Sequence, residues 1–348
     1  MERDGVGLCL SGGGYRAMLF HTGVLWRLNE LGMLARVRLI SSVSAGAITS
    51  GALARAWDSL EFDQGVAAGF DTEVVRPLRA LAGTTVDIGA ILRGVLKPWR
   101  TISEELAAAF RRELFGTYTL PQLPDRPVFD FNATNLRNGA RWLFSREWMG
   151  DELSGWVAEP EAQLAVAVAA SSAFPPFLSP VVLRLPGRIE RIVLTDGGVY
   201  DNLSMEPVID RCSTVLVSDG GTRLGHAHHV SGAWLRQTVR VLEVVDARVR
   251  QLRKRQLLRS YQDGDFAGAY WGTYSDIANY EVPATLPAPV GQTLRLACIP
   301  SRLEALEDRT QQRLINWGYA ISDAAMRSWI VPDAKPPDGF PYPAVGVG

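Results

Sequence analysis

Apolar positions near the start of the chain predict alternating strands and helices. Residues 5–10 (GVGLCL) and 37–43 (VRLISSV) are short apolar runs, which are typical of buried strands. Residues 15–32 have apolar side chains at nearly helical spacing up to Gly32, and residues 45–57 predict a second helix. This order indicates a parallel sheet with crossover helices. If the two strands are neighbours, the turns after them lie side by side at one edge of the sheet.

The rest of the pattern extends this unit into one α/β domain over residues 1–330. Residues 58–125 are mostly helical by pattern and are expected to form a helical insertion. Residues 127–145 predict a hairpin that turns at Asn138-Gly139. Residues 331–348 are rich in proline and glycine and predict an irregular tail. The other predicted elements are strands at 181–185, 191–195, 213–218 and 293–297, and helices at 160–172, 233–260 and 308–329.

Composition narrows the class of protein. Hydrophobic residues make up 47% and charged residues 21% of the 348 residues, which is ordinary for a soluble globular protein. The formal net charge of −1 argues against a nucleic-acid polymer as partner. Three widely separated cysteines, Cys9, Cys212 and Cys298, predict buried thiols in a reducing compartment. Because no basic and apolar leader begins the sequence, we expect a cytoplasmic protein that contacts a membrane only peripherally.

Ser44 lies at the end of the second predicted strand, directly before a predicted helix. Small residues flank it two positions away on both sides, at Ser42 and Gly46. This is the environment of a nucleophile elbow, in which a tight strand-to-helix turn raises a serine hydroxyl above the sheet edge. The usual pattern begins with glycine, and here Ser42 takes that position. The alternative interpretation is that Ser44 only caps the following helix.

Three consecutive glycines, Gly12, Gly13 and Gly14, follow the first predicted strand. Their spacing to Ala17 fits a dinucleotide-binding fingerprint, but the next strand ends in serines and not in the acidic residue that holds a ribose. A phosphate-binding P-loop is excluded because its lysine is missing. The remaining interpretation is an oxyanion hole built from glycine N–H groups beside Ser44. Arg16 is expected to brace this loop, to attract a phosphate or to form a surface ion pair.

A serine nucleophile needs a base, and the chain offers two kinds of candidate. Asp196 ends an apolar strand, and the two glycines after it allow the backbone to turn so that the carboxylate points off the sheet edge. A second Asp-Gly-Gly sequence, residues 219–221, is the runner-up. The histidines are a helical His21 and a loop-like cluster, His226, His228 and His229.

Three stretches together resemble the patatin-like phospholipases, of the bacterial type. SGGGYRA (11–17) resembles the G-G-G-x-R oxyanion loop, SVSAG (42–46) the nucleophile elbow and DGGVYDN (196–202) the D-G-[GA] motif. The resemblance covers roughly residues 5–220. It implies the patatin-like three-layer α/β/α fold with a mainly parallel central sheet and helical insertions.

The resemblance also implies a function and the residues that perform it. A dyad of Ser44 and Asp196 would cleave fatty-acyl esters of membrane phospholipids, as a phospholipase A or lysophospholipase does, with no metal or other cofactor. The N–H groups of residues 12–14 would stabilise the oxyanion. The supporting residues would be Arg16, Gly46, Gly197, Gly198 and Asn202, of which Asn202 is expected to hold the Asp196 turn.

Residues 236–259 contain eight basic and two acidic side chains. Such a run is typical of a solvated helix face or of a surface for lipid headgroups. The resemblance adds a third hypothesis, because some bacterial patatin-like phospholipases are antiphage effectors that a cyclic nucleotide activates by reordering a homo-oligomer. The enzyme would then act at the inner membrane. The predicted anion contacts are Arg248, Arg250, Arg253, Lys254 and Arg255.

Three other functions stay open at this stage. A carboxylesterase or lipase could use Ser44 with a base from the histidine cluster. A lipid-binding module without catalysis would have the same surface and no need for the serine. A nucleotide-binding oxidoreductase is disfavoured by the missing acidic residue after the second strand.

Overall fold

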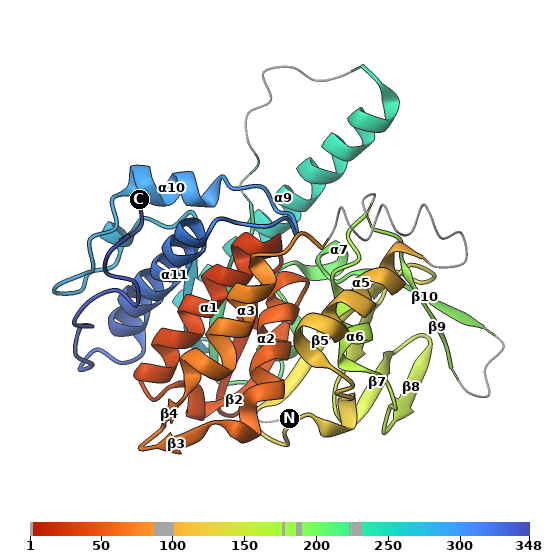
Figure 1. Cartoon of the computed structure of the whole chain (residues 1–348), viewed down its shortest axis with the longest axis horizontal. Coiled ribbons are helices and arrows are strands. Elements are labelled where there is room, and N and C mark those ends of the chain that lie inside the picture. Colours follow the sequence, from red (N-terminus) through yellow and green to blue (C-terminus); the bar gives the residue numbers. More distant parts are fainter. Residues whose placement is uncertain (1–2, 87–100, 176–177, 186–189, 223, 225–231) are drawn as a thin grey trace.

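A large mixed sheet with helices on both faces forms the body of the chain (Figure 1). The computed structural model describes residues 3–86, 101–175, 178–185, 190–222, 224 and 232–348. The strands are β1 (Val6–Leu10), β2 (Val37–Ser42), β3 (Glu61–Asp63), β4 (Val66–Ala68), β5 (Val128–Asn135), β6 (Arg141–Phe144), β7 (Trp148–Asp151), β8 (Gly155–Ala158), β9 (Val181–Arg184), β10 (Arg191–Asp196), β11 (Thr214–Asp219) and β12 (Ala267–Gly272).

Helices connect most of these strands. The α-helices are α1 (Gly14–Glu30), α2 (Ala45–Ala56), α3 (Arg76–Ala82), α5 (Ile102–Phe110), α6 (Leu164–Ser171), α7 (Gly198–Asp201), α8 (Glu206–Ile209), α9 (Trp234–Asp263), α10 (Val290–Ala297) and α11 (Asp308–Trp329). Single turns of 3-10 helix lie at Leu34–Arg36, Trp57–Ser59, Leu120–Gln122 and Ile277–Asn279, and π-helical turns lie at Asp71–Val75 and Arg111–Phe115.

The sheet has the strand order β12-β11-β1-β2-β5-β6-β7-β8, and β10 pairs with both β5 and β9. Strands β12, β11, β1, β2 and β5 run parallel, whereas β6 to β10 add antiparallel pairs. The prediction of a mainly parallel central sheet is therefore confirmed. Because β1, β2 and β11 are parallel neighbours, the turns that follow them meet at one edge.

Alternation along the central strands produces the layers. Leu8 and Leu10 of β1 join the larger core beneath α1, α2 and α11, whereas Cys9 between them joins a smaller core on the other face with Leu203 and Leu257. Side chains of a strand point alternately to the two faces, so one apolar strand supplies both cores. The result is the predicted three-layer α/β/α arrangement.

Most predicted elements of the first half are confirmed within a few residues. Helix α1 ends as expected before Gly32, whose φ of +64° lets its N–H turn back to the Asn29 carbonyl. The 127–145 hairpin is β5 and β6, and Gly139 is in the turn with a φ of +74°. The 58–125 insertion holds helices, but it also contains the β3–β4 hairpin.

In the second half of the chain, the predictions of a strand at 293–297 and of a buried Cys298 are wrong, and strand β12 was not predicted. Residues 293–297, which were predicted to be a strand, belong to helix α10. Their buried residues Thr293, Leu296 and Ala297 follow helical spacing. Strand β12 has two glycines and little alternation, so no pattern identified it. Cys9 and Cys212 are buried as expected, whereas Cys298 is exposed.

The proline- and glycine-rich tail forms no helix or strand, yet it folds back onto α11. The side chain of Asn316 donates to the carbonyls of Tyr342 and Gly346, and Val347 is buried. Within the described residues, no helix is both long and apolar enough to cross a membrane.

Candidate active site

Ser44 has a strained backbone at the junction of β2 and α2. Its φ of 54° and ψ of −119° lie in a region that residues with a side chain rarely adopt. The structure compensates with two hydrogen bonds: the Ser44 N–H donates to Ser171 Oγ over 2.8 Å, and Ser171 Oγ donates to the Asn132 carbonyl over 2.7 Å. Strain of this kind is typical of a nucleophile elbow and not of an ordinary helix cap.

Gly46 allows this tight turn. A Cβ atom at Gly46 would lie 2.2 Å from the Leu10 carbonyl oxygen, so only glycine fits where α2 crosses the end of β1. The Gly46 N–H donates to the carbonyls of Ser11 and Val43. The prediction that Gly46 supports the elbow agrees with this packing.

The glycine turn lies directly beside the elbow. A Cβ atom on Gly12 would be 3.1 Å from Ser44 Cβ. Gly13 and Gly14 have φ angles of +144° and +64°, which glycine adopts at little cost, and α1 begins at Gly14. Among the described residues, neither the Gly13 nor the Gly14 N–H has a hydrogen-bond acceptor. These two donors point from a helix N-terminus, where a negative charge is stabilised.

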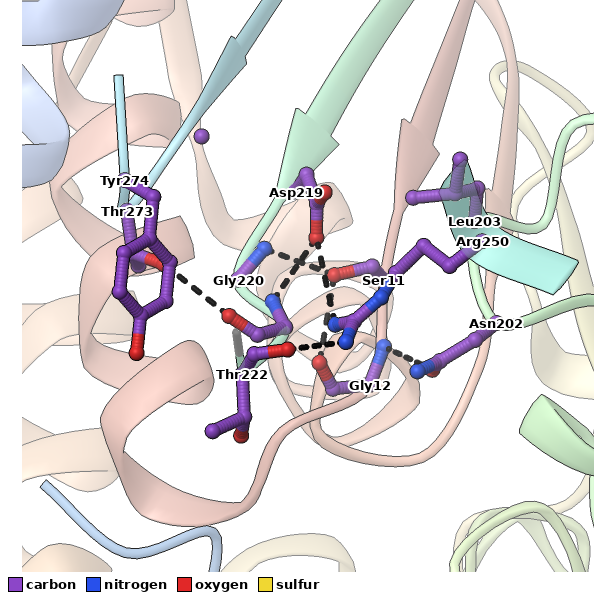
Figure 2. Close-up of polar contacts among 12 residues, drawn as sticks. Ser11, Gly12, Asn202, Leu203, Asp219, Gly220, Thr222, Arg250, Thr273 and Tyr274 are labelled. Carbon is purple, nitrogen blue, oxygen red and sulfur yellow. Dashed lines mark hydrogen bonds and ion pairs between the residues drawn. The ribbon is translucent and has the colours of Figure 1, made fainter. Parts of the chain in front are cut away.

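Asn202 holds the glycine turn, which changes the prediction for Gly12. Its side-chain Oδ1 accepts a hydrogen bond of 3.1 Å from the Gly12 N–H, and its carbonyl accepts a second one of 3.3 Å (Figure 2). The Gly12 N–H is therefore occupied, so it is not a free oxyanion donor as predicted. Asn202 was expected to hold the Asp196 turn. Its Oδ1 does lie against that turn, 3.0 Å from the place of a Cβ atom on Gly198, while its hydrogen bonds to backbone are with Gly12.

Asp196 combines burial with an open carboxylate oxygen. Its Oδ1 accepts a hydrogen bond of 2.7 Å from the Gly198 N–H, which fixes the turn at Gly197-Gly198. Its Oδ2 is buried, and within the described chain no donor makes a hydrogen bond of normal geometry to it. The Ser44 hydroxyl lies near enough to influence the carboxylate, which is typical of a catalytic pair whose contact tightens when substrate binds.

The surroundings of Asp196 change its protonation. The pKa of Asp196 is raised to about 7, chiefly by burial and to a lesser extent by the charge of Asp246. Hydrogen bonds from the Gly198 N–H and the Ser44 hydroxyl lower the pKa. A base that titrates near neutral pH can both take and return a proton.

Arg16 braces the loops around the glycine turn. The guanidinium is buried and donates to the carbonyls of Ala297, Ile299 and Gly220 at 3.2, 2.5 and 2.9 Å. It also donates to Thr222 Oγ1 and Ser301 Oγ. Burial lowers the pKa of Arg16 to about 10. Of the three roles considered for Arg16, bracing fits, whereas a surface ion pair and an accessible phosphate contact do not.

His21 is a structural residue that links the turns after β1 and β11. Its Nε2 lies 2.9 Å from the Ser11 carbonyl, so this nitrogen carries the hydrogen, and Nδ1 accepts from Ser218 Oγ at 2.8 Å. Burial lowers the pKa of His21 to about 4, which keeps the ring neutral. Ser11 Oγ in turn accepts from the Gly220 N–H (Figure 2). No local pattern around His21 indicated this link.

The runner-up base, Asp219, is occupied by other groups. Its Oδ1 accepts from the Gly221 N–H and its Oδ2 from the Tyr270 hydroxyl at 2.8 Å, and Arg250 lies 4.0 Å away. In Figure 2, Asp219 lies above Gly12, whereas Asn202 lies beside Gly12 on the right. Asp219 therefore belongs to the framework of the site.

The predicted basic contacts on α9 fall into two groups. Arg250 faces inward to Asp219, Asp246 and the Thr222 carbonyl, and Lys254 lies over the Tyr270 ring at 4.0 Å. Arg248 and Arg255 are exposed, and Arg253 is half-buried. His226, His228 and His229 lie outside the described residues. In the described ranges, no group of three or more His, Cys, Asp or Glu side chains could hold a metal ion.

Comparison with known proteins identifies the family. Residues 8–209 match the patatin-like phospholipase family. The chain belongs to this family. The match confirms the resemblance on which the prediction of a lipid hydrolase rests. No curated protein matches the sequence of this patatin-like chain.

Solved structures agree with the patatin-like fold. Human GIVD cytosolic phospholipase A2 aligns with a TM-score of 0.55 at 11% identity, covering 91% of this chain and 60% of that one. The same human enzyme in complex with methyl gamma-linolenyl fluorophosphonate aligns with a TM-score of 0.56 at 16% identity, over 92% and 57%. The chain thus spans about 60% of the length of this human protein.

Proposed function

We propose that the chain is a serine acyl hydrolase that cleaves fatty-acyl esters of phospholipids through Ser44 and Asp196. The observation that carries the proposal is the pairing of a strained Ser44 with a buried carboxylate whose Oδ2 has no normal hydrogen-bond donor in the described chain. Membership of the patatin-like phospholipase family supports the substrate class. The bacterial type and the cytoplasmic location stay predictions.

The reaction follows from these groups. Asp196 Oδ2 takes the proton of the Ser44 hydroxyl while Oγ attacks the ester carbonyl carbon. The N–H groups of Gly13 and Gly14 stabilise the oxyanion, each by about 3 to 4 kcal/mol as judged from other oxyanion holes. The bond to the alcohol oxygen breaks, and Asp196 returns its proton to that oxygen. Water then attacks the acyl-enzyme and gives a proton to Asp196. The bond between the acyl carbon and Ser44 Oγ breaks, Asp196 returns the proton to Oγ, and the fatty acid leaves.

Fatty-acid release from mixed phospholipid vesicles tests this proposal. The wild-type chain should release fatty acid, and Ser44→Ala and Asp196→Ala should each reduce the rate at least about 10⁴-fold. Ser172→Ala is the matched control, because it removes a buried serine hydroxyl of the neighbouring helix end without touching the dyad. Release that survives in Ser44→Ala would contradict the proposal. Binding to vesicles without any release would favour the lipid-binding module.

A further variant distinguishes the proposed Ser44–Asp196 hydrolase from an esterase that uses a histidine base. Replacing His226, His228 and His229 together by Gln leaves the rate unchanged if Asp196 is the base and abolishes it if a histidine is. The cyclic-nucleotide activator, the homo-oligomer and the antiphage role also stay predictions, supported by resemblance and by the basic side chains of α9. They require that a cyclic di- or trinucleotide change the release rate or the oligomeric state.

A further inference from the structure

Helix α9 extends away from the rest of the molecule with an exposed face that has both apolar and basic side chains (Figure 1). Residues spaced alternately by four and three positions form one stripe along it. This outer stripe consists of Trp234, Thr238, Val241, Val245, Arg248, Leu252, Arg255 and Arg259, and all eight are exposed. Trp234 is 76% exposed and Leu252 is 62% exposed. A continuous row of exposed apolar side chains bordered by charged ones is typical of an interaction surface.

The opposite face of α9 is joined to the edge of the sheet that carries the site. Arg250 donates to the Thr222 carbonyl and lies near Asp219 (Figure 2). The turn that follows Asp219 lies next to the glycine turn. Asp246 is within hydrogen-bond reach of the Asn202 side chain, which itself holds Gly12. Leu257 is buried in the core on this face of the sheet. The helix is therefore fixed to the active-site edge by its inner face, while its outer stripe remains open.

We propose that the outer stripe of α9 is a docking surface for an anionic lipid bilayer, which brings the Ser44 edge to its substrate. The inference rests on the proposed phospholipid hydrolase. A tryptophan with valines and a leucine fits the interface between headgroups and acyl chains, and the flanking arginines fit anionic headgroups. Each basic side chain near an anionic surface adds attraction that depends on salt.

A second copy of the chain fits this stripe less well. The stripe has three arginines and no acidic residue. If two stripes paired in parallel, arginines would face arginines, and if they paired antiparallel, arginines would face the apolar half. The acidic residues of α9 near its middle, Glu243 and Asp246, lie away from the stripe. Charge complementarity thus favours an anionic surface over self-pairing.

Vesicle sedimentation with the full chain tests the inference. The Ser44→Ala chain is mixed with vesicles of phosphatidylglycerol and phosphatidylethanolamine, or of phosphatidylcholine alone, so that lipid remains intact. It should bind the anionic vesicles at least about 10-fold more tightly. The double variant Arg248→Glu/Arg255→Glu should lower that partition coefficient about 30-fold, which equals about 2 kcal/mol. Replacing Val245 and Leu252 by Asp should also lower it, with a smaller effect of salt.

A matched control reverses two exposed arginines at the opposite edge of the sheet. Arg36→Glu/Arg55→Glu makes the same charge change, and it should bind vesicles as the parent does. Circular dichroism and the thermal midpoint establish that every variant is folded. Equal binding by the α9 variants and their parent would overturn the inference. So would a dimer, seen by sedimentation velocity, that the α9 variants dissociate.

The two proposals fail in distinguishable ways. Hydrolysis of a soluble short-chain ester by the wild-type chain measures the Ser44 site without any vesicle. If the chain hydrolyses the ester but the α9 charge variants bind vesicles as their parent does, only the docking proposal is overturned. If the chain binds vesicles through α9 but does not hydrolyse the ester, the proposed hydrolase function is overturned, and the docking surface loses its proposed role.

Discussion

Two Asp-Gly-Gly turns end two strands of the same sheet, and only one of them leaves its carboxylate open. In both, the aspartate Oδ1 accepts a hydrogen bond from the N–H two residues later, at 2.7 Å for Asp196 and 2.9 Å for Asp219. Asp219 Oδ2 is held by the Tyr270 hydroxyl. Asp196 Oδ2 has no such donor in the described chain and lies by Ser44.

An oxygen without a hydrogen-bond donor distinguishes the proposed catalytic carboxylate from the structural one. A buried polar atom without a donor is costly, so an ordinary framework residue acquires partners as Asp219 does. Asp196 keeps an uncompensated oxygen beside a strained serine, and burial raises its pKa to about 7. The chain tolerates this cost where a proton must move.

The largest expected effect is on catalysis. Asp196→Asn removes the base, so the rate of p-nitrophenyl ester hydrolysis should fall at least about 10⁴-fold. Asp219→Asn changes the same atoms in the same kind of turn, yet it should reduce the rate less than about 10-fold. Comparable losses in the two variants would mean that the open oxygen is not what distinguishes the sites.

The same two substitutions should affect stability in the opposite order: Asp196→Asn should stabilise the fold at pH 8, whereas Asp219→Asn should destabilise it. The folded pKa of Asp196, about 7, exceeds its unfolded value of about 4, so its favourable contribution is complete below about pH 4 and is lost as pH rises through 7. Asp196→Asn should therefore raise the free energy of unfolding at pH 8, by up to about 4 kcal/mol, and change it little at pH 4. Asp219→Asn should lower it by about 1 to 3 kcal/mol, because hydrogen bonds are lost. Urea unfolding at both pH values measures this, and a loss of stability in Asp196→Asn at pH 8 would count against a raised pKa.

Asn202 should have the smallest effect of the three, through the glycine turn. Asn202→Ala removes the side-chain acceptor of the Gly12 N–H, so kcat should fall about 10- to 100-fold with little change in KM. Asn202→Asp keeps an acceptor for Gly12 but cannot donate to Asp246, and it should recover part of kcat. If Asn202→Ala keeps the wild-type kcat, the turn does not depend on this contact.

Local sequence was enough to predict the elbow, the glycine turn and the Asp196 turn. Each of these is encoded within a few residues by a strand, small side chains and the start of a helix. What could not be predicted depends on residues far apart in the chain. Arg16 donates to the Ala297 carbonyl, 281 residues further along the chain, and Asn202 meets Gly12 across 190 residues.

The same limit explains the errors elsewhere. The two Asp-Gly-Gly turns are alike in sequence, and they are distinguished by distant residues such as Tyr270 on β12, which holds Asp219 Oδ2. That strand carries too little alternation to be predicted. The basic run of α9 was identified by its charge, but its division into inner and outer faces requires the packing of the helix against the sheet edge.

The most direct test of the Ser44–Asp196 pair is the rate of covalent labelling by an alkyl fluorophosphonate, followed by intact mass and peptide mapping. We expect a single adduct on Ser44 in the wild-type chain, labelling at a similar rate in Asp219→Asn, and labelling at least about 100-fold slower in Asp196→Asn. An adduct on another residue, or labelling of Ser44 that is equally fast in Asp196→Asn, would contradict it.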